Sequence, residues 1–349
     1  MKSIFNALRA QYPAHRLHIL NSKRNTGSLT YDGIDVCAER LVLEIEEELE
    51  SIRNRGGSVT KLSVVGYSIG GLVARYAVGL LESRGIFIDL DPMTFTTFAT
   101  PHLGVRSPFA GWHHQAWNAL GARVLSESGR QLFTVDSFRG SGRPLLSILA
   151  DPDSVFMTGL AKFNRRVLYA NIINDLQAAY YSAAITKTDV TPGQRKYFSG
   201  KEATGGISCW KASIWAYFES APVDLFIVVT IPIAVLFLLC NAVVQSIWGY
   251  FRIRNHQQLY INAFLPVDIK RSRHDGCSDT GRIHGSRMRL TPSQLSMISA
   301  LNEVGWHKYP VCIHRDKRSH AAIIARTDIA RFAEGHLVLK HWVEEGLLI

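Results

Sequence analysis

The chain has 349 residues, of which 47% are hydrophobic and 19% are charged, and its formal net charge at pH 7 is +10. This composition is typical of a folded globular protein and excludes wholesale disorder. The excess of positive charge suits nucleic acid or an anionic membrane surface. The sequence has no zinc-finger or RNA-binding signature and no basic run that alternates with aromatic residues, so we predict no nucleic-acid partner.

The five cysteines are spread along the chain without CxxC pairs or the spacing of a metal site. A sparse set of this kind is typical of reduced thiols in a cytosol-facing protein, so we predict neither a disulfide framework nor a metal site. Residues 1–16 are amphipathic, are interrupted by Arg9 and lead into no apolar core. We therefore expect no secretory signal peptide and a protein that is not secreted.

Apolar runs of strand type recur along the chain, at residues 17–20, 62–65, 93–99, 167–173 and 311–313. Stretches of helical periodicity alternate with them, including a long one that ends at Asn54 and a second one that starts after Gly70. Further helical segments follow Thr327. This alternation predicts an α/β fold in which helices cover both faces of a mostly parallel sheet.

Residues Gly66, Tyr67, Ser68, Ile69 and Gly70 fit the pattern G-x-S-x-G between a predicted strand and a predicted helix. In this setting the serine is held in a tight turn that lifts its hydroxyl above the sheet. We predict Ser68 as a nucleophile and the amide of Ile69 as an oxyanion donor at the start of the helix. We expect small residues to be required at 66 and 70, where a Cβ would clash with neighbouring backbone. The alternative is an ordinary glycine-rich turn.

A serine hydroxyl becomes a good nucleophile only when a base takes its proton and a carboxylate orients that base. In α/β-hydrolases the chain order is serine, acid, histidine. Asp175 follows the predicted strand at 167–173 and suits the acid, whereas Asp151 and Asp189 lie in polar stretches. His320 follows a β-rich segment and suits the base. Position in the chain alone does not exclude other histidines from this role: His307, His314, His336 and His341.

Four stretches, GYSIGGLVARY, TFATPHLG, YANIINDLQAAY and SHAAII, occur in this order. They resemble the serine esterases that include fungal lipid-droplet phospholipases and Rog-type acylglycerol lipases, and the resemblance covers most of residues 15–345. It implies an α/β-hydrolase fold over a single domain, 1–349, with Ser68, Asp175 and His320 as the catalytic triad. It also implies that His102, in TPHLG, shapes the site together with Gly66, Tyr67 and Gly70.

The chain departs from this family at its beginning. The family's first strand ends in an HG-type loop whose backbone amide is the second oxyanion donor. No such pair precedes residue 20, and His284-Gly285 lies far from the expected place. We therefore expect an N-terminally truncated form of the fold that lacks this strand and loop.

An apolar segment at 225–248 lies inside a predicted insertion at 187–255, and its first sixteen residues, 225–240, carry no charge. A helix of sixteen residues reaches about 24 Å, short of the roughly 30 Å of a bilayer core, and Pro232 would interrupt it. A single span would also separate Ser68 from His320. We therefore expect a hairpin or an interfacial helix, followed by a basic stretch that attracts anionic head groups. The alternative is a buried core helix.

These features predict a serine hydrolase that cleaves carboxylic esters of phospholipids or acylglycerols without a metal or an organic cofactor. The expected partner is a lipid substrate at the cytosol-facing surface of a lipid droplet or the endoplasmic reticulum. Two alternatives remain open: a catalytically inactive membrane- or droplet-associated hydrolase-like protein, and a soluble esterase or peptidase of the same fold. The sequence predicts no oligomeric state.

Overall fold

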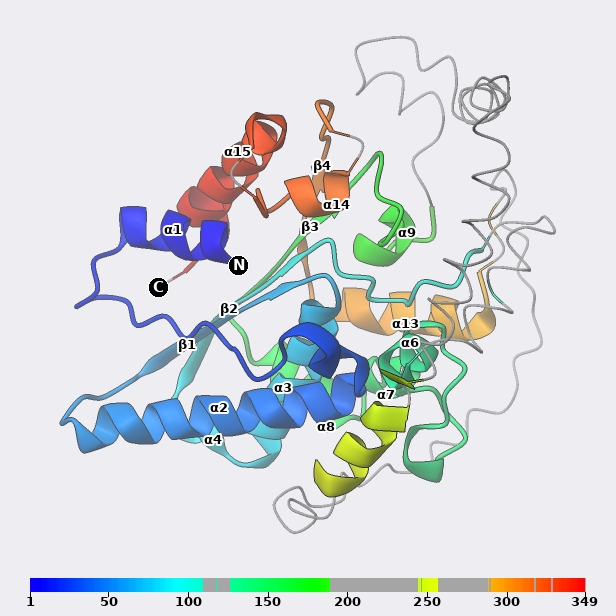
Figure 1. The fold of residues 1–349 in the computed structure, drawn as a ribbon, viewed down its shortest axis with the longest axis horizontal. Coiled ribbons are helices and arrows are strands. Elements are labelled where there is room, and N and C mark those ends of the chain that lie inside the picture. The colour runs from blue at the N-terminus through cyan, green and yellow to red at the C-terminus, as the bar shows by residue number, and fades with distance from the viewer. Residues whose placement is uncertain are drawn as a thin grey trace.

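Four parallel strands form the sheet at the centre of the fold (Figure 1). The computed structural model describes residues 1–108, 118, 126–188, 244–245, 247–256, 288, 290–316, 318–327 and 329–348. Within these ranges the strand order is β1-β2-β3-β4, and each neighbouring pair is parallel. The bounds are Lys61–Tyr67 for β1, Asp91–Phe98 for β2, Arg165–Asn171 for β3 and His307–Val311 for β4. The predicted parallel sheet is confirmed.

The two central strands bury side chains on both faces of the sheet, as the alternation of side chains along a strand requires. Phe95 of β2 and Leu168 of β3 belong to one hydrophobic cluster. Phe98 and Val167, from the same two strands, belong to another. All four side chains are buried, so each face of the sheet carries its own core.

Helices cover both faces, as predicted. Figure 1 shows α2, α3 and α8 on one side of the sheet and α1 and α15 on the other. The first cluster involves α2 (Ile34–Asn54), α3 (Ile69–Ser83), α4 (Ile86–Asp89), α7 (Leu145–Leu149), α8 (Val155–Ala161), α9 (Tyr180–Ala183) and α13 (Pro292–Glu303). The second involves α1 (Lys2–Gln11), α14 (Ser319–Ala322), η3 (Ala330–Phe332), α15 (Ala333–His341) and the π-helical turn η4 (Trp342–Gly346). Shorter elements complete the chain: η1 (Gly27–Tyr31), α6 (Glu127–Leu132) and η2 (Phe138–Gly140).

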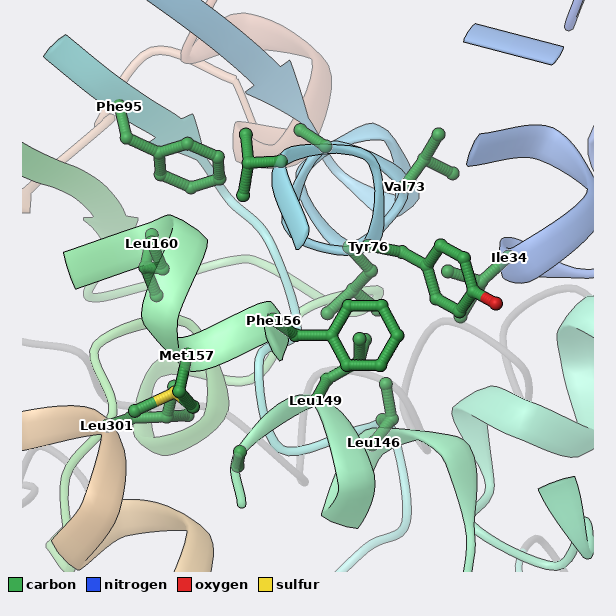
Figure 2. Close-up of a cluster of buried hydrophobic side chains, with 14 of the residues drawn as sticks. Ile34, Val73, Tyr76, Phe95, Leu146, Leu149, Phe156, Met157, Leu160 and Leu301 are labelled. Carbon is green, nitrogen blue, oxygen red and sulfur yellow. The ribbon is translucent and has the colours of Figure 1, made fainter. Parts of the chain in front are cut away.

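The crossing of α3 and α8 forms the centre of the first cluster (Figure 2). The ring of Tyr76 lies 4.6 Å from the ring of Phe156, measured between centroids. A Cβ at Gly79 would lie 2.7 Å from the Cα of Phe156, and a Cβ at Gly159 would lie 2.5 Å from the carbonyl oxygen of Val78. The two glycines therefore allow the helix backbones to approach closely enough for the aromatic rings to pack.

Two of the expected strands differ from the structure. Residues 17–20 form no strand, so the prediction there is wrong. The last strand begins earlier than expected, at His307, and ends at Val311, because its pairing with β3 sets its bounds: Val167 faces His307 and Asn171 faces Val311. The remaining strands extend one or two residues beyond the apolar runs that predicted them or shift by that amount.

Most of the predicted insertion at 187–255, and of its apolar segment at 225–248, lies outside the described residues. The chain is helical again at 244–245 and at 247–256. In the parts of the chain that the structure describes, no helix is both long and apolar enough to cross a membrane.

Candidate active site

Ser68 stands alone between the last residue of β1 and the first residue of α3. Its φ is 55° and its ψ is −132°, a strained conformation for a residue with a side chain. Hydrogen bonds hold the turn on both sides: the amide of Ser68 donates to the carbonyl of Phe98 at 2.9 Å, and the amide of Gly71 donates to the carbonyl of Ser68 at 3.0 Å. The strand-to-helix turn that the motif predicts is therefore formed, and strain is concentrated at the serine.

The close approaches that this turn needs occur at Gly66 and Gly71. A Cβ at Gly66 would lie 2.7 Å from the amide nitrogen of Gly71, and a Cβ at Gly71 would lie 2.7 Å from the Cγ2 of Thr100. At Gly70, in contrast, a Cβ would have no heavy-atom neighbour within 4 Å outside its own helix and its adjoining residues. The expected steric requirement at Gly70 is therefore wrong, and Gly71 is the glycine that sequence reasoning missed.

The structure brings Ser68, His320 and Asp175 into one line of hydrogen bonds. His320 Nε2 lies 2.9 Å from Ser68 Oγ, and His320 Nδ1 lies 3.0 Å from Asp175 Oδ2. The side chains of His320 and Asp175 are only 7% and 2% exposed. A carboxylate at Nδ1 keeps the proton on that nitrogen and leaves Nε2 free to accept the proton of the serine hydroxyl.

Asp175 follows β3 and is held by several donors besides His320. Asn171 Nδ2 donates to its Oδ2 at 2.8 Å, and the amides of Gln177 and Ala178 donate to its Oδ1 at 3.0 and 2.8 Å. Burial alone would raise the pKa of Asp175, but the hydrogen bond and charge of His320, with the bonds from Ala178 and Asn171, outweigh it and lower that pKa. The carboxyl group therefore stays ionised beside the imidazole.

His320 lies on the short helix α14, which is tied to the other two parts of the site. Ser319 Oγ donates to the carbonyl of Ile173, just before Asp175, at 2.8 Å. Tyr67, the residue before Ser68, donates its hydroxyl to the carbonyl of His320 at 2.9 Å, and its ring lies 5.2 Å from the imidazole. Burial raises the pKa of Tyr67 to about 12, so the phenol remains a donor. Tyr67 therefore links the serine turn to the histidine.

The competing candidates lie elsewhere or outside the described residues. Asp151 pairs with Arg143 at 2.7 Å, and Asp189 is not described. His341 Nδ1 lies 2.9 Å from the hydroxyl of Tyr169, and His314 Nδ1 lies 3.6 Å from a Glu334 carboxylate oxygen. The other two histidines are at the start of β4 (His307) and on α15 (His336).

The amide of Ile69 is the first of α3, and the first amides of an α-helix have no acceptor within their own helix. It follows Ser68 directly, so it suits the predicted role of oxyanion donor. His284-Gly285 falls outside the described residues. Among the residues that are described, no cluster of His, Cys, Asp and Glu is arranged to hold a metal ion.

His102 lies in the core beside β2. Its Nε2 is 3.1 Å from Thr97 Oγ1, its ring is 5.3 Å from Trp306, and burial keeps its pKa well below the usual value. Its carbonyl accepts a long hydrogen bond of 3.4 Å from Arg75, which also donates to the carbonyl of Leu149 at 2.9 Å. Arg75 is buried, which lowers its pKa to about 9. The sequence signal for these hydrogen bonds was Arg75 itself, a charged residue among the apolar residues of α3, and the sequence analysis missed it.

Three known proteins are similar to parts of this chain. The putative lipase C4A8.10 of Schizosaccharomyces pombe is 34% identical over 129 residues, which is 36% of this chain and 16% of that protein. Two Saccharomyces cerevisiae proteins, the putative lipases YDL109C and ROG1, are each 29% identical to this chain, and each match covers 54% of it. The match with YDL109C extends over 191 residues, 28% of that protein. The match with ROG1 extends over 193 residues, 26% of that protein. The aligned part of the chain thus spans less than a third of each of these relatives. No solved structure matches the chain.

The family model described as putative serine esterase (DUF676) matches residues 1–188, more than half of the chain. The matched region contains Ser68, the turn around it and Asp175, and it ends before His320. The chain belongs to the putative serine esterase family, DUF676.

Proposed function

We propose that this protein is a serine hydrolase that cleaves carboxylic esters of lipids, phospholipids or acylglycerols, through an acyl-enzyme on Ser68. One observation carries the proposal: the hydrogen-bonded line from Ser68 Oγ through the two nitrogens of His320 to Asp175. Family membership supports the serine esterase class, and the names of the relatives, which are putative lipases, support a lipid ester.

In the proposed reaction His320 Nε2 takes the proton of Ser68 as Oγ attacks the ester carbonyl carbon. Asp175 stabilises the imidazolium that forms, and the amide of Ile69 donates to the developing oxyanion. When the tetrahedral intermediate collapses, the alcohol leaves with the proton from His320 and the acyl group stays on Oγ. Water then attacks the acyl-enzyme with His320 as base, which releases the fatty acid and restores the serine.

We place this reaction at the cytosol-facing surface of a lipid droplet or of the endoplasmic reticulum. The support is the uncharged apolar run at 225–240 and the excess of lysine and arginine over acidic residues across 251–290. Apolar area and positive charge are the two features that attach a protein to an anionic lipid surface.

The test is labelling of the purified chain by a serine-reactive phosphonate probe, together with fatty-acid release from phospholipid vesicles and from acylglycerol emulsions. Ser68→Ala should abolish both labelling and release. A well-folded chain that takes up no probe would instead support the inactive, hydrolase-like alternative. Turnover of soluble esters without any release from lipid would support the soluble esterase.

A further inference from the structure

The helix at residues 247–256 is held against the rest of the protein by contacts with two carboxylates. Arg252 donates to both carboxylate oxygens of Asp32, with Nη2 at 2.7 Å from Oδ1. His256 Nε2 lies 3.0 Å from a carboxylate oxygen of Glu39. The side chain of Asp32 is fully buried, and Glu39 and His256 are nearly so. Because hydrogen bonds to buried carboxylates are charge-assisted and strong, these contacts hold this face of the helix against the protein.

The opposite face of the same helix is exposed and apolar. Ile247, Trp248 and Phe251 are spaced so that they share one side of the helix, and the exposed Val244 precedes them at the same helical spacing in the sequence. Trp248 is 62% exposed, Phe251 is 60% and Ile247 is 52%, and Tyr250 beside them is 60% exposed. We call these five residues the exposed apolar face. Soluble proteins seldom leave neighbouring large apolar side chains in water, and such a patch marks an interaction surface.

This helix lies toward the carboxyl-terminal end of the strands, the end that carries the catalytic residues. α2 ends at Asn54 and β1 begins at Lys61, so the chain turns back within a short loop and α2 runs antiparallel to β1 (Figure 1). The N-terminal end of α2 therefore lies at the edge where β1 ends and Ser68 follows. Asp32 and Glu39 are at this end of α2, and Figure 1 shows the docked helix, in yellow, beside it.

The composition of the exposed apolar face indicates a lipid surface as its occupant. Tryptophan and tyrosine are the residues that favour the boundary between water and lipid, because their rings are apolar and each carries a polar group. The exposed Arg254 stands next to this face, and the sequence around it is basic, which complements anionic head groups. In the sequence, an uncharged apolar run at 225–240 precedes the helix.

We infer that the helix at 247–256 is a rigidly docked lipid-contact surface, which lays Val244, Ile247, Trp248, Tyr250 and Phe251 into a lipid interface and presents the edge with Ser68 to it. The inference deepens the proposed function, since it names how the site meets an insoluble ester. Contacts with Asp32 and Glu39 hold one face of the helix, so the other face alone is available to the lipid.

The test is flotation of the full chain with vesicles of phosphatidylcholine and phosphatidylserine. The double variant Trp248→Ser with Phe251→Ser should bind about 100-fold more weakly, since each aromatic ring contributes about 10-fold to partitioning. The matched control is Ile88→Ser with Leu337→Ser, two exposed apolar residues on other helices, 84% and 69% exposed, and it should bind like the parent chain. Turnover of a water-soluble ester should be the same in all three proteins.

Equal binding of the parent chain and the double variant would overturn the inference, and so would a parent chain that does not float. A double variant that changes the oligomeric mass but not the flotation would identify a second copy as the occupant and would also overturn it. Failure of the proposed function has a different signature. In that case Ser68→Ala would leave ester turnover unchanged while flotation still depended on Trp248 and Phe251.

Discussion

Asp175 fixes both the protonation state and the orientation of His320. Its carboxylate accepts from Nδ1 at 3.0 Å and is itself held by Asn171 and by two backbone amides. An asparagine at this position has nearly the same shape but would offer an amide N–H or a neutral oxygen. The orientation of the histidine would then depend on a much weaker acceptor.

For Asp175→Asn we expect the turnover of a soluble ester to fall about 10⁴-fold, because Nε2 loses its role as base. The stability effect should depend on pH. Since the pKa of Asp175 is lowered in the folded chain, its ionised form stabilises the fold above the usual aspartate pKa of about 4, and this contribution is lost as the pH falls through the lowered value. Urea unfolding of both proteins measures this: their difference in unfolding free energy should be full at neutral pH and shrink in acid. A difference that does not change with pH would contradict it.

At the residue scale, motif and chain order were sufficient to predict Ser68 and Asp175, whereas position left several histidines open and the family resemblance selected His320. The sequence was not sufficient for Gly71. That glycine is required by Thr100, which reaches it from the end of the neighbouring strand, and the glycine pattern alone pointed to Gly70 instead. Contacts between residues that are distant in sequence depend on how strands are ordered in the sheet, which local patterns do not contain.

At the scale of elements, the crossing of α3 and α8 depends on Gly79. A methyl group there would meet the backbone and ring of Phe156, both of which are fixed in the core. Helix propensity would favour alanine by about 1 kcal/mol, whereas overpacking of a core costs about 1–3 kcal/mol. The steric effect should prevail because the contact involves backbone, which has little freedom to shift.

We therefore expect Gly79→Ala to lower the free energy of unfolding by up to about 2 kcal/mol in urea titrations. The matched control is Gly70→Ala on the same helix, where a Cβ meets no atom within 4 Å. This control should unfold at the same or a slightly higher urea concentration, since only the propensity changes. Equal stability of the two variants would show that the crossing has room for a methyl group.

The strands show what periodicity can and cannot predict. The buried strands β2 and β3 each contain a stretch of apolar and β-branched residues, so the sequence located them to within two residues. β4 is different, since its residues His307, Lys308 and Pro310 give no apolar pattern. In the described part of the chain it is the last strand of the sheet and pairs with β3 on one side. Such a strand tolerates polar residues and a proline because its outer side needs no ladder hydrogen bonds.

At the scale of the whole molecule, the docked helix joins two parts of the chain that are 220 positions apart, at Asp32 and Arg252. The sequence predicted an apolar segment, 225–248, that ends within this helix and a basic stretch that begins within it, but not the surface against which the helix packs. Asp32 also accepts a hydrogen bond from Arg40 at 2.7 Å, so one carboxylate holds two cations. The pair with Arg252 joins residues that are far apart in sequence, which explains why local patterns do not reveal it.

Loss of the Arg252 contact should uncouple lipid binding from hydrolysis. Arg252→Gln removes the ion pair of the helix with Asp32, while Asp32 keeps Arg40 and Glu39 keeps Arg139 at 3.0 Å, so no carboxylate is left without a cation. Flotation with vesicles should persist because the exposed apolar face is intact. Fatty-acid release from the same vesicles should fall by roughly 10-fold, since a loosely held helix no longer orients the edge with Ser68 toward the lipid.

Arg254→Gln is the matched control, because it removes the same charge from the exposed side of the same helix. It should weaken binding to anionic vesicles slightly, by the electrostatic contribution of one arginine, and leave the release per bound molecule unchanged. Turnover of a soluble ester should be equal in both variants and in the parent chain. If Arg252→Gln and Arg254→Gln lowered vesicle hydrolysis equally, charge rather than orientation would be the cause. Unchanged hydrolysis in Arg252→Gln would mean that docking of the helix does not orient the site.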